Sequence, residues 1–546
     1  MRLASSFFCR SAGLRLGLCL LLGLGAACSR PSRVDQGDRD GTLHLGNFGD
    51  PRELDPHLAT GIPETNVLYA LGEGLVRADG TDLHPTPGVA ERWDVSPDQR
   101  TYTFHLRADA RWSNGEPLTA PQFVRSWQRA LSPELAGEHS FYLWVLRNAE
   151  AFNKGRLQDF DQVGVHAPDD HTLRVDLEHP TPFLFRLLLQ RFFFPVYLPG
   201  IEKTGAVNDR SNQRWTLPGS YVGNGPYTLA EWQVNRQIVV RRNPNYWNAA
   251  RIRIREVRYY PIDNGAAEES AFRGGLLHKT SSTNVSPAKL AVWNREHPGW
   301  AHFDPYIGSY FYLLNTKRPP LDDVRVRRAL ALSVDRESLV KNVTRAGELP
   351  AYNYTPPNAG NYTARARIPY DPTGARRLLA EAGYPGGKGL PPLAVLFNTS
   401  EQHKEIAQAI QAMWKKELGV EINLSNQEWK VYLNSRRTMD FTVCRAGWIG
   451  SLDPSFFLEN MLSGGANNQT GWASPEYDHL IEQARAETDP AARDEKFQRA
   501  ETLLMDAAPL VPMYFYTNTY LLRPSVRGWH GNLIDYHPFE ELSLQP

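Results

Sequence analysis

A strand–helix–strand pattern over residues 393–424 constrains the fold of this chain most strongly. Residues 393–397 (LAVLF) form a continuous apolar run, which is typical of a strand buried on both faces. A helix is predicted from near Ser400 to Gly419, and VEINL at 420–424 then alternates with a period of two. Such a β-α-β unit predicts an α/β fold with a mostly parallel sheet covered by helices.

The chain is too long for a single core, because 546 residues correspond to two or three domains. Its first half carries several β-rich or alternating segments, separated by turns that contain proline and glycine. These predicted strands are Thr42–Phe48, Tyr102–Leu106, Thr172–Leu177 and two strands within 238–262. In the second half, Ser474-Pro475 and Asp489-Pro490 each predict a helix start, with a capping side chain before a proline.

The N-terminus resembles an export signal. Three arginines accompany a short apolar run, Leu16–Leu24, which is too short to span a bilayer. Small residues at 25–27 directly before Cys28 resemble a bacterial lipoprotein cleavage site, at which the cysteine becomes lipidated. Cleavage as an ordinary signal peptide is the alternative. We therefore predict an exported, periplasmic protein with a signal peptide over 1–27, a lipid anchor on Cys28 and a flexible tether over 28–41.

Charge and cysteine content narrow the possible partners. Lys and Arg together number 60, as do Asp and Glu, so no bulk charge favours nucleic-acid binding. Loss of the leader with its three arginines would give a net charge of −3. Only Cys444 would then remain inside the fold, so we expect no intrachain disulfide there and a buried, inert thiol.

The sequence carries no signature of a cofactor site or of a common catalytic motif. HExxH, GxSxG, CxxC, a Walker loop and GxGxxG are all absent, and the 15 histidines have no metal-ligand spacing. The glycine-rich segment GYPGGKG at 383–389 follows a helix and is predicted to be a loop. We predict a binding protein with no catalytic residue, cofactor or metal; a carboxylate pair of the glycosidase kind is the minority alternative.

A series of short segments resembles the periplasmic oligopeptide-binding proteins of ABC peptide importers, extracellular solute-binding protein family 5. The resemblance extends from about residue 46 to the C-terminus. Each segment alone is a weak signal, but their order over this length is specific to the family. They read LDPHLATG (54–61), GEGLV (72–76), PGVAERW (87–93), TFHLRADARWSNGEPLTA (103–120), FVRSWQRAL (123–131), NGPYTL (224–229), RRNPNYWN (241–248), DDVRVRRALALSVDRE (322–337), LPAYNYTPP (349–357), LLAEAGYP (378–385), NQEW (426–429), CRAGW (444–448) and TGWASPEYDHLI (470–481).

The resemblance implies an α/β, two-lobed periplasmic-binding-protein clamshell with an additional inserted domain. Lobe I would comprise residues 42–72, 202–307 and 517–546, with the inserted domain at 73–201 and lobe II at 308–516. The two crossings between the lobes would form a hinge, and closure would bury the ligand.

The resemblance also implies how a peptide is held, as an extended strand bound through its backbone. Segment 444–448, with Gly447, would line one side of it. The other expected ligand-binding residues are the pocket positions Trp429, Trp448, Tyr306, Phe311 and Ile62, and Arg436, Arg445 and His403 toward the peptide carboxylate. A guanidinium binds a carboxylate bidentately and keeps its charge. The alternatives are an ordinary ion pair for each arginine and a solvated position for His403.

The segment GWIGSLDP at 447–454 departs from the family pattern GW-x-x-D-Y-x-x-P. It is one residue shorter and lacks the aspartate that pairs with the α-amino group of the peptide; Ser451 stands near its place. Because an unpaired buried ammonium is heavily penalised, we predict that Asp453 replaces it. Alternatively, the site takes no charged amine and favours blocked or unusual N-termini. Thr344 and Thr60 likewise replace a family lysine and a family acid.

Three functions are compatible with the sequence. The leading hypothesis is capture of oligopeptides for an ABC transporter permease by a monomer that contacts the membrane only through its anchor. The second is a receptor of the same fold for murein peptide or another specialised ligand, such as haem or a metal chelate. The third is a lipid-anchored hydrolase.

Overall fold

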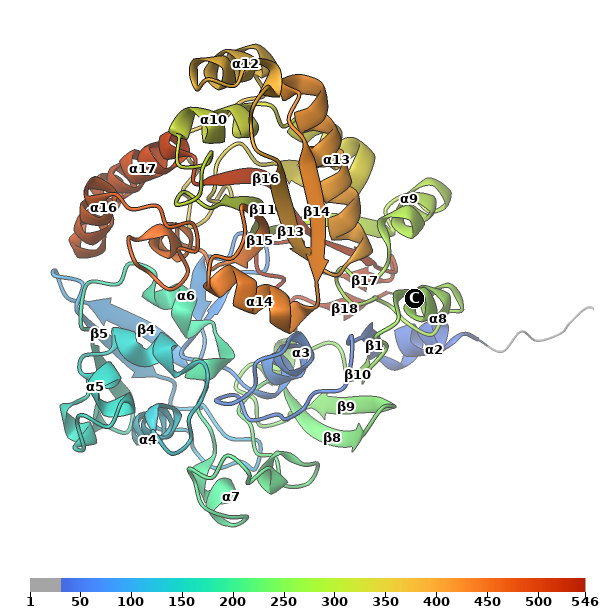
Figure 1. Cartoon of the computed structure of the whole chain (residues 1–546). Helices are drawn as coiled ribbons and strands as arrows, with labels where there is room; N and C mark the ends of the chain where they lie inside the picture. The colour runs from blue at the N-terminus through green and yellow to red at the C-terminus, as the bar shows by residue number, and fades with distance from the viewer. Residues whose placement is uncertain (1–30, 546) are drawn as a thin grey trace, which may run out of the picture.

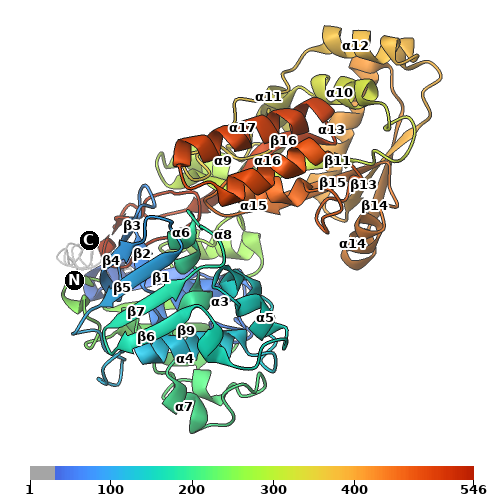
Figure 2. The same ribbon diagram turned by 90° about the vertical axis from the view of Figure 1, so that its left-hand side faces the viewer.

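The computed structural model describes residues 31–545, which form two bodies joined by a pair of long strands (Figures 1 and 2). The predicted signal peptide and Cys28 lie outside the described residues. We call the body that contains β1–β10 the first lobe and the body that contains α10–α17 the second lobe. No helix among the described residues is both long enough and apolar enough to cross a membrane.

The first lobe contains two four-stranded sheets. One has the order β1-β10-β9-β8, with β1 parallel to β10 and the other pairs antiparallel, and the other sheet, β4-β5-β7-β6, is antiparallel throughout. Their strands are β1 (Thr42–Gly46), β8 (Tyr227–Gln233), β9 (Gln237–Arg242), β10 (Glu256–Tyr260), β4 (Ala90–Val95), β5 (Thr101–Leu106), β6 (Val165–Asp169) and β7 (Thr172–Asp176). Short pairs are formed by β2 (Val76–Ala78) with β3 (Pro85–Pro87) and by β17 (Val526–Arg527) with β18 (Ser543–Leu544).

Most helices of the first lobe surround these sheets, whereas α9 packs against the long strands β11 (Ala301–Leu314) and β16 (Leu510–Leu521) (Figure 2). The helices of this lobe are α2 (Arg33–Asp40), α3 (Ile62–Leu71), α4 (Ala120–Leu131), α5 (Ala149–Asn153), α6 (Leu184–Leu188), α7 (Leu198–Glu202), α8 (Gly265–Arg273) and α9 (Pro287–Glu296). Each sheet has its own apolar core, and that of the β4–β7 sheet includes Trp112 and Trp127, whose side chains are fully buried.

The second lobe is built on a six-stranded sheet with the order β12-β16-β11-β15-β13-β14. Its strands are β11 (Ala301–Leu314), β12 (Leu349–Pro350), β13 (Leu393–Asn398), β14 (Ile422–Gln427), β15 (Val443–Ile449) and β16 (Leu510–Leu521). The helices are α10 (Val324–Leu332), α11 (Arg336–Leu339), α12 (Pro372–Glu381), α13 (Glu401–Leu418), α14 (Trp429–Arg437), α15 (Ser455–Leu458), α16 (Pro475–Ala486) and α17 (Pro490–Ala507).

The predicted β-α-β unit is confirmed, but the prediction of a mostly parallel sheet is wrong. β13 and β14 pair in parallel, and α13 ends at Gly419, whose left-handed backbone (φ 70°) caps the helix as the sequence predicts. The sheet is mixed because β11, β12 and β16, from distant parts of the chain, complete it in antiparallel pairs. A local pattern could not show these partners.

β11 and β16 connect the two lobes. They pair from Ala301 with Leu521 to Leu313 with Leu510, and the register shifts between Pro305 and Ser309. The β16 residue Tyr520 belongs to the core of the β1–β10 sheet, whereas Tyr514 of the same strand belongs to the core of the second lobe. This shift therefore lies where the two strands leave one core and enter the other, and a second shift, between Tyr310 and Phe311, lies within the core of the second lobe.

The N-terminal tether prediction is wrong for residues 33–40, which form α2. Ser32 and Asp35 make a capping box, in which the Ser32 hydroxyl accepts from Asp35 N and the Asp35 carboxylate accepts from Ser32 N. Asp38 Oδ1 lies 3.1 Å from His278 Nε2, and Val34 N donates to Gly275 O. These contacts dock the helix on the first lobe, although its composition is polar.

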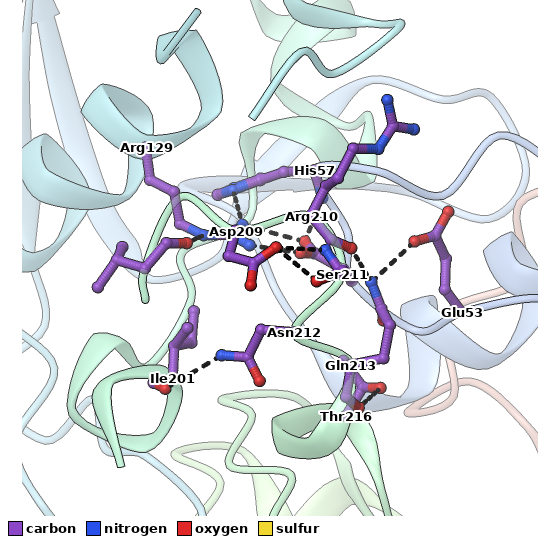
Figure 3. Close-up of polar contacts among 12 residues, drawn as sticks. Glu53, His57, Arg129, Ile201, Asp209, Arg210, Ser211, Asn212, Gln213 and Thr216 are labelled. Carbon is purple, nitrogen blue, oxygen red and sulfur yellow. Dashed lines mark hydrogen bonds and ion pairs between the residues drawn. The ribbon is translucent and has the colours of Figure 1, made fainter. Parts of the chain in front are cut away.

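A buried ion pair between Asp55 and Arg129 fixes the LDPH segment to α4; Figure 3 labels Arg129 and His57 of this cluster. The Arg129 guanidinium donates to both carboxylate oxygens of Asp55, at 2.5 and 3.1 Å, and to His57 Nδ1 at 3.0 Å. Because Arg129 can only donate, His57 Nδ1 accepts and Nε2 donates to Phe194 O. Arg129 Nε also donates to Val207 O, so this cluster joins four separate segments of the first lobe.

Candidate functional site: a cleft between the lobes

A large cleft lies between the two lobes, with a volume of about 1590 Å³. The first lobe contributes Phe48, Ile62, Tyr69, Ser282 and Asp535 to its lining, among other residues. The second lobe contributes His403, Arg445, Trp448, Ser451 and Tyr516, among others. Five predicted ligand-binding residues are thereby brought together, namely Ile62, Tyr306, His403, Arg445 and Trp448.

β15 presents an unpaired edge along this cleft. β11 pairs with the whole strand, from Leu314 with Val443 to Gly308 with Ile449. On the other side, β13 pairs only with Val443 and Cys444. Among the described residues, 445–449 have no partner strand on that side. An extended peptide can pair with such an edge through its backbone.

Of the two arginines predicted to meet the peptide carboxylate, Arg445 and Arg436, the structure places Arg445 in the cleft. Its Nη2 donates to Tyr516 Oη at 3.2 Å and its Nη1 to Asn398 Oδ1 at 3.5 Å, and the guanidinium lies 4.8 Å from the centre of the Tyr310 ring. Its Nε is buried and has no hydrogen-bond partner among the described residues. The two Nη contacts hold the charge in place, and the second N–H of each Nη atom is left for an anionic ligand.

His403 lies beside Arg445, in the first turn of α13. Its Nδ1 is 3.3 Å from Tyr310 Oη, and its backbone N–H donates to the capping hydroxyl of Ser400. Burial, together with the positive charge of Arg445, lowers the pKa of His403 to about 3. The imidazole is therefore neutral at ordinary pH and can offer a ligand a hydrogen bond but no charge.

Trp448 and Tyr306 also line the cleft. Trp448 is half-buried and its indole N–H donates to Phe456 O at 2.8 Å, which orients the ring. Burial and the nearby charge of Asp535 raise the pKa of Tyr306 to about 12, so the phenol stays neutral.

The other predicted ligand-binding residues do not line the cleft in this structure. Phe311 lies on β11, packed edge-on against Tyr354 with ring centres 5.0 Å apart, and is 5% exposed. Because side chains alternate along a strand, its neighbour Tyr310 is the residue directed toward Arg445. Gly447 lies on β15, where an added side chain would collide with the Tyr516 hydroxyl.

Trp429 and Arg436 lie on α14, beside the cleft but outside its lining. Trp429 is 49% exposed and stacks on Tyr432, with ring centres 5.6 Å apart. Arg436 Nε donates to Gln469 Oε1 at 2.9 Å. Tyr432 donates its hydroxyl to Arg445 O, so α14 supports the strand that forms the cleft wall. A direct role for Trp429 or Arg436 in ligand contact remains a prediction.

The prediction that Asp453 serves as the ammonium partner is wrong for this structure. Its carboxylate accepts from both Nη atoms of Arg493, at 2.8 and 2.9 Å, and Asp453 is 2% exposed. Arg186 Nη1, from α6 of the first lobe, lies 3.8 Å from Oδ2 of the same carboxylate. A carboxylate held by two arginines has no free charge to offer a ligand. Ser451, in contrast, lines the cleft.

Within the described range, 31–545, neither possible metal ligands nor thiols form a second site. Among the described residues, Asp79, Asp82 and His84 bring possible metal-ligand atoms together. His84 Nδ1 is 2.6 Å from Asp82 Oδ1, so hydrogen bonds within this exposed turn account for the cluster. Cys444 is buried as predicted, and burial raises the pKa of its thiol to about 12. The thiol is therefore protonated and inert.

Sequence reasoning missed several residues that line the cleft. Tyr516, Tyr69 and Asp535 lie in segments that carry no motif, and only their packing brings them to the site. Asp535 has a left-handed backbone (φ 54°), which is uncommon outside glycine and which asparagine and aspartate adopt more readily than most residues. No pattern in the sequence indicated that this acid would reach the cleft.

Comparison with known proteins agrees with this architecture. Residues 84–469 match the family described as "Bacterial extracellular solute-binding proteins, family 5 Middle". The chain is 40% identical over 504 residues to the periplasmic oligopeptide-binding protein OppA of Escherichia coli K12, and the alignment covers 90% of each protein. It is 37% identical over 493 residues to the periplasmic murein peptide-binding protein MppA of the same organism, covering 88% of this chain and 89% of MppA.

Solved structures share the fold. The unliganded open form of MppA superposes with a TM-score of 0.81 at 36% identity, covering 92% of this chain and 97% of that one. Haemophilus influenzae OppA in complex with the peptide RPPGFSPFR gives a TM-score of 0.72 at 34% identity, covering 93% and 99%. The resemblance of the sequence segments is thus confirmed over the whole architecture, and the chain belongs to the bacterial extracellular solute-binding proteins of family 5.

Proposed function

We propose that this protein is the substrate-binding component of an ABC peptide importer. It captures extended oligopeptides in the cleft between its lobes, closes over them and delivers them to the membrane permease. The observation that carries this proposal is the unpaired edge of β15 along a cleft of about 1590 Å³. Peptide backbone can pair with this edge while side chains of different sizes occupy the remaining volume.

The charges of the cleft support a free peptide as ligand. Arg445 lines the cleft at one end of the unpaired edge, and each of its Nη atoms has a second N–H beyond the hydrogen bond that it already makes. A guanidinium in that position suits a terminal carboxylate. The relatives named as oligopeptide-binding and murein peptide-binding proteins agree with a peptide ligand.

A receptor for murein peptide is the second candidate. Two observations favour it: GWIGSLDP lacks the family acid for a free amine, and the structure superposes with a TM-score of 0.81 on the open form of MppA. Mass spectrometry of ligands that co-purify with the protein separates the two candidates. Peptides of many sequences are expected for the importer, whereas one murein peptide would favour the specialised receptor.

The proposal includes export to the periplasm and a lipid anchor on Cys28, with the folded part acting as a monomer. The small residues before Cys28 support the anchor. A hydrolase is the remaining alternative. Incubation of the protein with a defined peptide mixture should leave every peptide intact, and progressive cleavage would contradict a binding role.

A further inference from the structure

The loop that carries Asp535 meets the far end of β15. Leu533 O accepts from Ile307 N at 2.9 Å, and Ile307 O accepts from Gly450 N at 3.1 Å. Residues 533–535 therefore lie beside the end of β15 that is opposite to Arg445. Ser451, which stands near the place of the missing family acid, lines the cleft at this same end.

The Asp535 carboxylate is held in a fixed orientation toward the cleft. Ser282 Oγ donates to Oδ2 at 2.8 Å, and Oδ1 lies 2.7 Å from His537 Nε2. The side chain is 26% exposed and lines both the main cleft and a smaller cavity of about 70 Å³ next to it. Each carboxylate oxygen has more than one acceptor site, so capacity remains for a ligand donor.

Asp535 is ionised, and among the described residues its carboxylate has no lysine or arginine within ion-pair distance; its partner at that range is His537, at 2.7 Å. Burial opposes ionisation, but hydrogen bonds from His537 and Ser282 and the charge of Lys279 hold the pKa of Asp535 well below its usual range. Lys279 is not within ion-pair distance; its Nζ donates to Thr280 O and Ser282 Oγ and lies 4.3 Å from the centre of the Tyr520 ring.

Asp535 is the acid of this region that reaches the cleft. Burial lowers the pKa of Lys279, while the charges of Asp535, Glu268 and Asp304 act in the opposite direction. Of these three acids only Asp535 lines the cleft, and burial raises the pKa of Glu268, which favours its neutral form. A positively charged ligand group placed at Asp535 would pair with its carboxylate, because opposite charges in a poorly solvated site attract strongly.

We propose that Asp535 is the countercharge for the α-ammonium of a bound peptide, in place of the acid missing from GWIGSLDP. This inference deepens the proposed function and rests on it. The peptide would extend along β15 with its carboxylate at Arg445 and its amine near Gly450. Five residues of strand separate these positions, about 16 Å at 3.3 Å per residue. An extended peptide of four or five residues spans this distance.

The test compares tetra-alanine with N-acetyl-tetra-alanine by calorimetry in the parent protein and in Asp535→Asn. The parent should bind the acetylated peptide at least about 30-fold more weakly, as expected when one partner of a buried charge pair is lost. In Asp535→Asn the ratio of the two affinities should approach one, because only the free-amine peptide loses affinity. Asp263→Asn is the matched control: it removes the same charge from an exposed site of the first lobe and should keep the parent ratio.

The outcomes separate the two proposals. A parent protein that binds no peptide contradicts the proposed function. If the parent binds both the free and the acetylated peptide with similar affinity, the role of Asp535 is overturned but the proposed function stands. The same holds if the ratio of the two affinities is unchanged in Asp535→Asn. If Asp535→Asn does not fold, a crystal structure of the parent with tetra-alanine decides: the amine nitrogen should lie about 3 Å from an Asp535 carboxylate oxygen. An amine bound elsewhere would overturn the inference.

Discussion

Asp453 and Arg493 form a buried bidentate ion pair at the boundary of the second lobe with the first, with N–O distances of 2.8 and 2.9 Å. The pair joins the loop that follows β15 to α17. Arg186, from α6 of the first lobe, lies 3.8 Å from the same carboxylate. The acid closest in sequence to the expected ammonium site therefore stabilises the fold and is unavailable to a ligand.

Asp453→Ala should destabilise the protein strongly. Removal of one partner leaves the Arg493 charge buried and unpaired, which costs about 3–5 kcal/mol of unfolding free energy. Urea denaturation of the full-length parent and variant measures this loss of unfolding free energy. Asp440→Ala is the control, because it breaks the exposed ion pair with Arg318 and should cost less than about 1 kcal/mol. Equal, small effects of the two variants would contradict the structural role of Asp453.

Arg445→Gln should weaken binding of a peptide with a free C-terminus. Loss of the charged partner of a buried carboxylate costs about 2–5 kcal/mol, whereas a C-terminally amidated peptide should lose much less. Calorimetry with the acid and the amide of one peptide measures the difference. Arg437→Gln is the matched control, since Arg437 is exposed on α14 and donates only to Asn434. The same loss for acid and amide in Arg445→Gln would place the carboxylate elsewhere.

The protein should become less stable as the pH falls below neutrality. Burial, together with the charge of Arg129, lowers the pKa of His57 to about 4, while in the unfolded chain this histidine has its ordinary pKa near 6.5. Between pH 6.5 and 4 the unfolded state therefore binds a proton that the folded state does not, and the unfolding free energy decreases toward acid. His57 alone contributes about 1.4 kcal/mol per pH unit within this window.

Denaturant titrations at several pH values test this contribution. His57→Gln should be less stable than the parent at pH 7, because a buried hydrogen bond is altered, and its stability should depend less steeply on pH between 6.5 and 4. Parallel pH profiles of the parent and the variant would show that His57 does not carry the effect.

Ligand binding should close the cleft and stabilise the protein. At a free ligand concentration one hundred times the Kd, mass action adds about 2.7 kcal/mol to the unfolding free energy. Small-angle X-ray scattering should show a smaller radius of gyration with saturating peptide, because the lobes approach each other. A radius that stays constant while the stability rises would indicate binding without closure.

Cys28→Ser should release the protein from membranes. The prediction follows from the small residues before Cys28, which resemble a lipoprotein cleavage site. Fractionation of cells without detergent measures the distribution: the parent is expected with the membranes and the variant in the soluble fraction. Recovery of the parent in the soluble fraction would contradict the anchor and favour an ordinary signal peptide.

Local patterns in the sequence predicted the elements that depend on neighbouring residues. The run at 393–397 and the left-handed Gly419 specify strand and helix end through periodicity and backbone freedom. Ser474-Pro475 and Asp489-Pro490 likewise cap α16 and α17 as predicted. The sequence also contains the Ser32 and Asp35 of the α2 capping box, but the polar composition of this segment favoured the prediction of a tether.

Only the tertiary structure decided which charged groups remain free for a ligand. Asp453 lies next to the expected ammonium position in sequence, yet its partner Arg493 is 40 residues away. Asp535 is remote from every motif, and the hydroxyl that orients it, Ser282, is 253 residues distant. A carboxylate is available only if its long-range neighbours leave it incompletely neutralised and directed into the cleft. That property depends on which distant segments pack together, and sequence spacing does not record it.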